Sequence, residues 1–200
     1  MDLHNLLMSS KFHYWSRQDN YRQMPNPQKQ KGSNWEREIA QFLTHHYGEH
    51  FMRAPGSGAY VGGTNSSRKQ LMHENVVRVF KGDIVPGESF GKLNIEAKSY
   101  KDFPFHQLFL GKPIRQLEDW IDQAMTVADP DDLTMLFLKF TRKGTYIVTQ
   151  TRPLFMAPPY SLQYQSENHG TWIFSELEGF FELNSQYVKI FSQTTHTSAS

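Results

Sequence analysis

Three residues near the middle of the chain have side chains and spacing suited to work on a phosphate group: Asp83, Glu96 and Lys98. Residues 92–100 read as a β-strand, and side chains alternate between the two faces of a strand. Glu96 and Lys98 therefore point to one face, while the apolar residues between them point to the other, toward a core. This places a carboxylate and an ammonium group side by side on a rigid surface.

Asp83 precedes a tight connection at Pro86-Gly87, so we expect residues 83–85 to form the antiparallel neighbour of that strand. Asp83 and Glu96 would then converge on one cation, and Mg²⁺ needs only one or two carboxylates because it keeps several waters. The metal would polarise a phosphate oxygen and lower the pKa of a bound water. Lys98 would orient or help deprotonate that water, or offset charge in the transition state. The alternative is a surface ion pair between Glu96 and Lys98.

Glu36 has two interpretations, and the residues alone leave both open. Ser33-Asn34-Trp35-Glu36 has the pattern of a capping box, in which Glu36 satisfies a backbone N–H at a helix start. Glu36 also shares a helix face with Leu43 and Tyr47, which would bring it to the boundary between helix and sheet, near the metal.

Arg53 and the turn Gly56-Ser57-Gly58 form a candidate phosphate-binding segment. Small residues allow the backbone to approach a phosphate closely, and exposed N–H groups bind anions. The alternative is an ordinary loop. The nine histidines do not form a metal-binding pattern, since Gly48 separates His46 from His50, and we expect no zinc.

Periodicity and breaker residues predict the remaining elements. Residues 24–32 read as an extended linker, and 59–75 read as a surface insertion that carries Arg68 and Lys69. The helices are expected at 33–48 and 114–127, and the strands at 51–54, 76–80, 83–85, 92–100, 133–140 and 145–149.

Composition is compatible with one folded domain with extensions. The chain has 200 residues, of which 38% are hydrophobic and 14% aromatic. It has no run of ~20 apolar residues for a membrane span, no recognisable secretion signal, and no cysteine for disulfides or thiolate metal sites. We expect a cytoplasmic protein, because the absence of cysteine fits a reducing cytosol.

Charge is distributed unevenly along the chain. Residues 1–115 hold 16 Lys and Arg against 10 Asp and Glu, whereas residues 116–200 hold 5 against 10. The basic half contains Asp83, Glu96 and Lys98, so its positive charge would face a polyanion. The alternative is ordinary scatter of charge.

Four segments together resemble the archaeal-type Holliday junction resolvases of the PD-(D/E)XK nuclease superfamily. They are Lys31-Gly32-Ser33-Asn34-Trp35-Glu36-Arg37-Glu38-Ile39, Arg53-Ala54-Pro55-Gly56-Ser57, Lys81-Gly82-Asp83-Ile84-Val85 and Ile95-Glu96-Ala97-Lys98-Ser99. The resemblance implies an α/β fold with a restriction-endonuclease-like core, in which helices flank a central mixed β-sheet. We expect an N-terminal arm at 1–28, the nuclease core at 29–150, a C-terminal extension at 151–190 packed on the core, and a disordered tail at 191–200.

The resemblance also implies roles for individual residues. Metal ligands would be Glu36, Asp83, Glu96 and the backbone carbonyl of Ala97, with Lys98 beside the attacking water. The expected DNA-binding residues are Lys31, Arg37, Arg53, Ser57, Arg68 and Lys69. The cofactor would be Mg²⁺, with Mn²⁺ able to substitute. A symmetric homodimer would supply the two paired incisions that a four-way junction needs.

Gly82 stands where the superfamily motif has proline, and the stretch between Ser57 and Asp83 is longer than in compact family members. Our first interpretation is a structure-selective endonuclease that resolves branched DNA. A nicking, repair or restriction-type nuclease of the same superfamily is the second. A non-catalytic DNA-binding module is the third.

Overall fold

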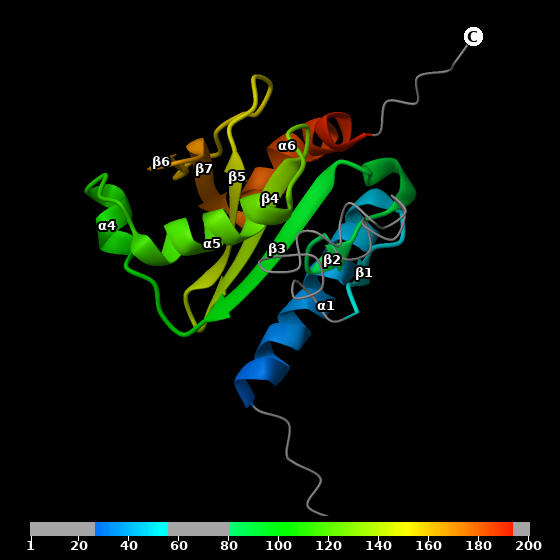
Figure 1. Cartoon of the computed structure of the whole chain (residues 1–200), viewed down its shortest axis with the longest axis horizontal. Helices are drawn as coiled ribbons and strands as arrows, with labels where there is room; N and C mark the ends of the chain where they lie inside the picture. The colour runs from blue at the N-terminus through cyan, green and yellow to red at the C-terminus, as the bar shows by residue number, and fades with distance from the viewer. Residues whose placement is uncertain (1–26, 56–80, 194–200) are drawn as a thin grey trace, which may run out of the picture.

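A mixed β-sheet between two layers of helices organises residues 27–55 and 81–193, the part of the chain that this computed structural model describes (Figure 1). The elements in chain order are α1 (Pro27–Tyr47), β1 (Met52–Arg53), β2 (Ile84–Val85), η2 (Glu88–Phe90), β3 (Leu93–Tyr100), α4 (Phe105–Phe109), α5 (Arg115–Val127), β4 (Leu133–Phe140), β5 (Gly144–Gln150), β6 (Leu162–Ser166), β7 (Gly170–Glu176) and α6 (Leu177–Ser192). The expected strand at 76–80 lies outside the described residues.

The central sheet has the strand order β3-β4-β5-β7-β6, with β3 at one edge. β3 and β4 are parallel, and the other neighbours are antiparallel. A parallel pair needs a crossover connection, and α4 and α5 lie within it. Residues 151–190 contain β6, β7 and most of α6, so two of the five strands of this sheet come from that segment.

Apolar side chains on both faces of the sheet form two core clusters. On β4, Met135 and Phe137 pack with α1 and α6, whereas Leu136 and Leu138 pack with α5. The indole Nε1 of Trp35 donates a hydrogen bond of 2.9 Å to the Phe137 carbonyl, which fixes α1 to the sheet. The architecture is therefore α/β, with a mixed central sheet flanked by helices on both faces, as expected (Figure 1).

The start of α1 differs from the expectation. The helix begins at Pro27 rather than Ser33, so residues 27–32 are helical and not an extended linker. Proline is favoured in the first turn, because its fixed φ suits a helix and its missing N–H would have no partner there. Ser33 is thus inside the helix and cannot act as the N-cap of a capping box. The expected end is confirmed, since Gly48 adopts φ +69° and its N–H bonds the Thr44 carbonyl at 2.9 Å.

The predicted hairpin between residues 83–85 and 92–100 is wrong. β2 pairs with β1 in a separate two-stranded sheet, with Arg53 opposite Ile84. The connection to β3 contains η2, whose Phe90 is fully buried. Burying this ring moves the chain away from a tight turn, and β3 instead forms its ladder with β4.

The other expected elements in the described residues agree with the structure to within a residue or two, including the strand at β1, α5, β4 and β5. In the part of the chain that is described, no helix has the length and apolar character needed to cross a membrane.

Candidate active site

Asp83 lies against the outer edge of β3, on the side away from β4. Its backbone N–H donates to the Ile95 carbonyl at 2.8 Å, and its Oδ2 accepts the Ala97 N–H at 2.8 Å. The residue is only 6% exposed. The N–H and C=O of one strand residue point to the same side, so the Ala97 carbonyl also faces the edge where Asp83 lies. The predicted neighbourhood of Asp83 and residues 95–97 is thus present without the predicted hairpin.

Gly82 explains how Asp83 comes so close to β3. A Cβ atom at this position would lie 2.4 Å from the Ile95 carbonyl oxygen and 3.0 Å from Asn94 Oδ1. Any other residue, including the proline of the superfamily motif, carries a Cβ and would push the segment away from the strand. The departure from the motif is therefore a requirement of this backbone approach.

Gly82→Ala should destabilise the fold by roughly 1–3 kcal/mol, the usual cost of forcing an extra carbon into a packed site. Displacing Asp83 should also weaken Mn²⁺ binding. Urea denaturation and calorimetric Mn²⁺ titration measure the two effects. Gly32→Ala is the matched control, because Gly32 lies within α1 with nothing within 4 Å of its added Cβ. Equal behaviour of the two variants would show that the close approach at Gly82 does not position Asp83.

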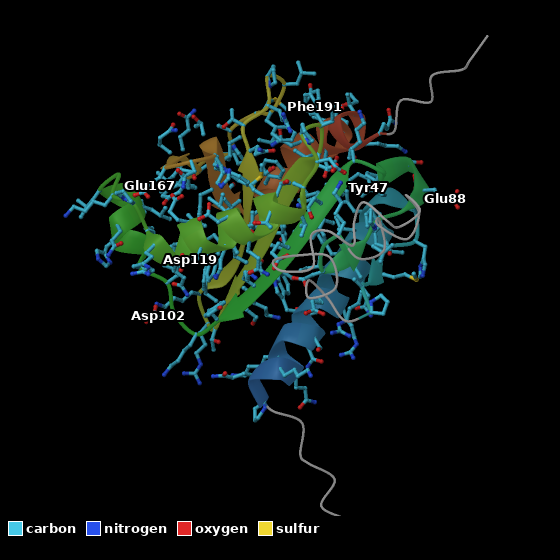
Figure 2. The ribbon with its side chains drawn as sticks, viewed as in Figure 1. Tyr47, Glu88, Asp102, Asp119, Glu167 and Phe191 are labelled. Atoms are coloured by element: carbon cyan, nitrogen blue, oxygen red, sulfur yellow. The ribbon has the colours of Figure 1, made fainter. Side chains whose placement is uncertain are left out.

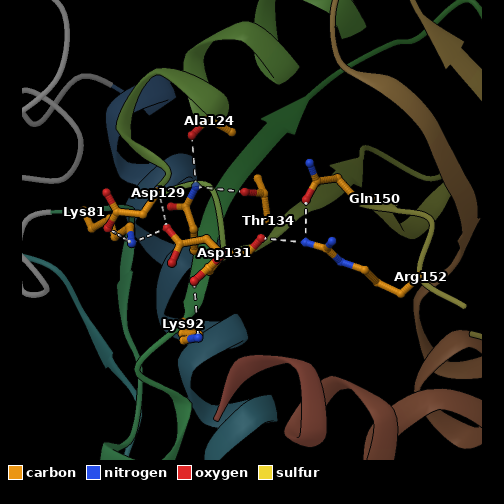
Figure 3. Close-up of polar contacts among 10 residues, drawn as sticks. Lys81, Lys92, Ala124, Asp129, Asp131, Thr134, Gln150 and Arg152 are labelled. Atoms are coloured by element: carbon orange, nitrogen blue, oxygen red, sulfur yellow. Dashed lines mark hydrogen bonds and ion pairs between the residues drawn. The ribbon is translucent and has the colours of Figure 1, made fainter. Parts of the chain in front are cut away.

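Lys81 anchors the segment that leads into Asp83 through ion pairs with two aspartates. Its ammonium group forms an ion pair with Asp129 at 2.9 Å (Figure 3). It also forms an ion pair with Asp132, and the Lys81 side chain is buried. Asp132 also accepts the Asp129 N–H at 2.6 Å. Burial raises the pKa of Asp132 above its ordinary value despite the nearby lysine. The segment before Asp83 is therefore tied to the loop between α5 and β4.

Glu96, Lys98 and Gln123 form a hydrogen-bonded triangle between β3 and α5. Lys98 Nζ lies 2.6 Å from Glu96 Oε1 and 2.8 Å from Gln123 Oε1. Gln123 Nε2 donates to the same Glu96 Oε1 at 2.8 Å. Glu96 is 3% exposed, so the pair is not the surface ion pair of the alternative interpretation. Leu93 and Ile95 lie in the opposite core cluster, which confirms the predicted alternation along β3.

Sequence reasoning missed Gln123. It is an exposed polar residue on an amphipathic helix, and such residues usually just face solvent. Only the packing of α5 over β3 brings it to Glu96 and Lys98. Its amide is suited to this place, because one end accepts from the ammonium group while the other donates to the carboxylate.

Glu36 is buried on α1 and forms an ion pair with Arg53 on β1. Since Arg53 is paired with Ile84, this carboxylate is directed toward the strand that follows Asp83. The second interpretation of Glu36, at the boundary between helix and sheet, agrees with this position. Its Oε2 accepts a hydrogen bond from Arg53 Nε.

Two of the remaining predicted DNA-binding residues, Lys31 and Arg37, lie on α1. Arg37 is exposed on α1 and bonds Asn34 at 3.0 Å. Lys31 lines a groove of about 940 Å³ together with Lys98. Ser57, Arg68 and Lys69 lie outside the described residues.

The donor set at the edge of β3 fits a hard divalent cation. Among the described residues, no three His, Cys, Asp or Glu side chains are close enough together to count as a metal-binding group. The Asp83 carboxylate nevertheless accepts the N–H of Ala97, which follows Glu96 in β3. Asp83, Glu96 and the Ala97 carbonyl all offer oxygen atoms. One or two carboxylates with a carbonyl oxygen suffice for Mg²⁺, which completes its shell with water.

Comparison with known proteins identifies the family. A family model described as "Phage putative PDDEXK endonuclease" matches residues 27–189, from the first residue of α1 into α6. No curated protein and no solved structure matches the chain. The match supports the PD-(D/E)XK nuclease superfamily but not the archaeal-type Holliday junction resolvases in particular. PD-(D/E)XK nucleases are hydrolases that generally use divalent metals. With more than half of its length covered by this match, the chain belongs to the phage PD-(D/E)XK endonuclease family.

Proposed function

We propose that the protein is a Mg²⁺-dependent endonuclease that cuts the phosphodiester backbone of branched DNA, four-way junctions in particular. The observation that carries this proposal is the approach of the Asp83 carboxylate to Ala97, within the same short stretch of β3 that carries Glu96 and Lys98. Mn²⁺ is expected to substitute for Mg²⁺, since both accept oxygen ligands in octahedral geometry.

In this proposal Asp83, Glu96 and the Ala97 carbonyl would hold the metal, with Glu36 as a further ligand. Bound there, Mg²⁺ supplies Lewis-acid polarisation of the phosphate and a water of lowered pKa. Lys98 holds that water beside the phosphorus or offsets the charge that develops on the phosphate oxygens. Gln123 keeps the Lys98 ammonium group beside Glu96, so it is a positioning residue.

The preference for branched DNA rests on the resolvase-like segments that open with Lys31 and continue through Arg53 to Asp83. A four-way junction needs two paired incisions, and a homodimer with a two-fold axis supplies two equivalent sites. The protein is therefore also proposed to act as a homodimer, in the cytoplasm of the host cell.

Cleavage of three matched substrates tests the proposal. End-labelled four-way junction, linear duplex of the same sequence and single strand are each incubated with the full chain in Mg²⁺ or in EDTA. We expect Mg²⁺-dependent, symmetrically placed cuts in the junction and little cutting of the other two. Equal cutting of linear duplex would replace junction resolution with a nicking, repair or restriction-type activity. Tight binding without cleavage by folded protein would contradict the enzymatic proposal.

A further inference from the structure

A basic groove continues from Lys98 along the molecule, beyond the residues of the candidate site. Three segments line it: the start of α1, the end of β3 with the residues after it, and the turn between β4 and β5. The lining residues are Gln28, Lys31, Ala97, Lys98, Ser99, Tyr100, Lys101, Asp102, Thr141, Arg142 and Lys143. Five of these are lysine or arginine, and Asp102 is the single acid among them. The groove therefore has the charge of a site for a polyanion.

Strand register brings the basic residues together. β3 and β4 run parallel with Tyr100 opposite Phe140, so the turn that follows β4 lies beside the residues that follow β3. The Thr141 N–H donates to the Tyr100 carbonyl at 3.0 Å and closes this junction. Arg142 and Lys143 thereby line the same groove as Lys101, although about forty residues separate them in sequence. The sequence carried a signal in these charged positions, but using it required the parallel register.

Hydrogen bonds define the backbone of the β4–β5 turn. The Lys143 N–H bonds the Phe140 carbonyl at 3.0 Å, and the Tyr146 hydroxyl donates to the Lys143 carbonyl at 2.6 Å. Arg142 adopts φ +61°, in the left-handed region. Lys101, Arg142 and Lys143 are all exposed. With the backbone already fixed, binding a charged group here requires ordering of side chains but not of the turn itself.

Asp102 moderates this charge in the free protein. It forms an ion pair with Lys143, and the hydrogen bond from Lys143 holds the pKa of Asp102 below its ordinary value. Both side chains are largely exposed, and exposed ion pairs contribute little free energy. Lys143 can therefore exchange Asp102 for a phosphate oxygen at small cost.

We propose that Lys101, Arg142 and Lys143 bind phosphate groups of the DNA strand being cut, on one side of the cleavage position; this rests on the proposed function. Lys101 lies three residues beyond Lys98, about 10 Å at ~3.3 Å per strand residue. Successive phosphates of one DNA strand lie farther apart than the ~3.4 Å rise per base along the helix axis, so this length spans fewer than three steps. The contacted phosphates are accordingly within about two steps of the one that is cut.

Binding experiments on the full chain in EDTA test this assignment, because no metal-dependent cutting interferes there. The slope of log Kobs against log salt concentration is negative for DNA binding. In the double variant with Arg142→Ala and Lys143→Ala, the magnitude of this slope should decrease by about 2, or about 1 for each lost phosphate contact. Asp102→Asn should have the opposite effect on DNA affinity and tighten binding at low salt. The substitution releases Lys143 and removes a negative charge from the groove.

Two control variants remove single charges away from the groove: one cation, half the charge change of the double variant, and one acid, the same charge change as Asp102→Asn. Lys189→Ala removes a lysine whose ammonium group lies 3.8 Å from Glu49, just beyond the last residue of α1, Tyr47. Asp102 lies near the opposite end of that helix (Figure 2). Asp131→Asn removes an exposed acid whose nearest ion-pair distance, to Lys92, is 3.6 Å. Both controls should bind DNA nearly as the wild type does.

A methylphosphonate scan locates the contact. A single uncharged linkage within about two steps to one side of the cut should weaken binding by the wild type but leave binding by the double variant unchanged. Unchanged binding by the double variant and by Asp102→Asn would overturn the assignment and would favour an acidic protein segment as the occupant. The proposed endonuclease activity is tested separately. Cutting of DNA by the wild type in Mg²⁺ would support that activity even if the groove variants bound DNA normally. An uncharged linkage that weakens binding by the wild type but not by the double variant would support the groove assignment even if no DNA were cut.

Discussion

Asp83→Asn is expected to reduce Mg²⁺-dependent DNA cleavage by about 10³-fold or more. At the proposed metal site, asparagine would replace one anionic ligand by a neutral amide, and the lost metal stabilisation would be worth several kcal/mol, with each ~1.4 kcal/mol equal to a factor of ten. The amide oxygen of asparagine can still accept the Ala97 N–H that Asp83 Oδ2 accepts at 2.8 Å. The variant should therefore fold normally, and the loss should appear in single-turnover cleavage rates.

Asp119→Asn provides the matched control for that variant. Asp119 is exposed on α5, and its replacement makes the same change of charge and size (Figure 2). Its cleavage rate should stay within about twofold of the wild type, as expected for a surface substitution. A rate for Asp83→Asn within a few-fold of this control would remove Asp83 from the metal site.

Lys98→Met should separate chemistry from metal binding. Methionine keeps an unbranched stem but lacks the ammonium group, so we expect cleavage to fall by about 10²–10³-fold, the usual effect of removing one charged group aimed at the reacting atoms. The affinity for Mn²⁺ should be retained or increased, because the ammonium group 2.6 Å from Glu96 Oε1 no longer competes for that carboxylate. Rapid-quench cleavage and calorimetric Mn²⁺ titration measure the two quantities.

Lys112→Met is the control for nonspecific loss of a cation, since Lys112 is exposed between α4 and α5. It should leave cleavage and Mn²⁺ affinity unchanged. If Lys98→Met instead weakened Mn²⁺ binding and cleavage in parallel, Lys98 would act by supporting the metal ligands and not by assisting the attacking water.

Alternation along β3 was accessible from the sequence because it depends only on backbone geometry. The positions of Leu93, Ile95, Glu96 and Lys98 follow from it, and the structure has them as expected. α5 and β4 were equally accessible, since their apolar patterns are long. These local patterns were enough to bring Glu96 and Lys98 to one face.

The pairing of β2 was not accessible, because it is decided by tertiary contacts. Pro86-Gly87 suggested a tight hairpin, yet Phe90 is buried in the core and redirects the connection. Asp83 still contacts β3 without the predicted hairpin, because Gly82 permits close approach of its backbone to Ile95. Gly82 was noticed only as a departure from a motif, and its reason needed the position of a neighbouring strand.

Gln123 and the basic groove were inaccessible for a related reason. Gln123 reaches Glu96 through packing between a helix and the sheet, and Lys143 reaches Lys101 through the parallel register of β3 and β4. Neither the bond of Gln123 to Glu96 nor the shared groove of Lys143 and Lys101 follows from spacing within one segment. The capping-box pattern at Ser33 illustrates the converse, since a local signal was overridden when the helix extended back to Pro27.

The most direct measurement of the metal site is a crystal structure of the full chain soaked in Mn²⁺, with the ion located by its anomalous scattering. We predict one ion bound by carboxylate oxygens of both Asp83 and Glu96 at about 2.1 Å, with the Lys98 ammonium group nearby, and no ion at this position in Asp83→Asn. An ion bound only elsewhere, or Asp83 and Glu96 side chains directed away from each other on opposite sides of β3, would contradict the account.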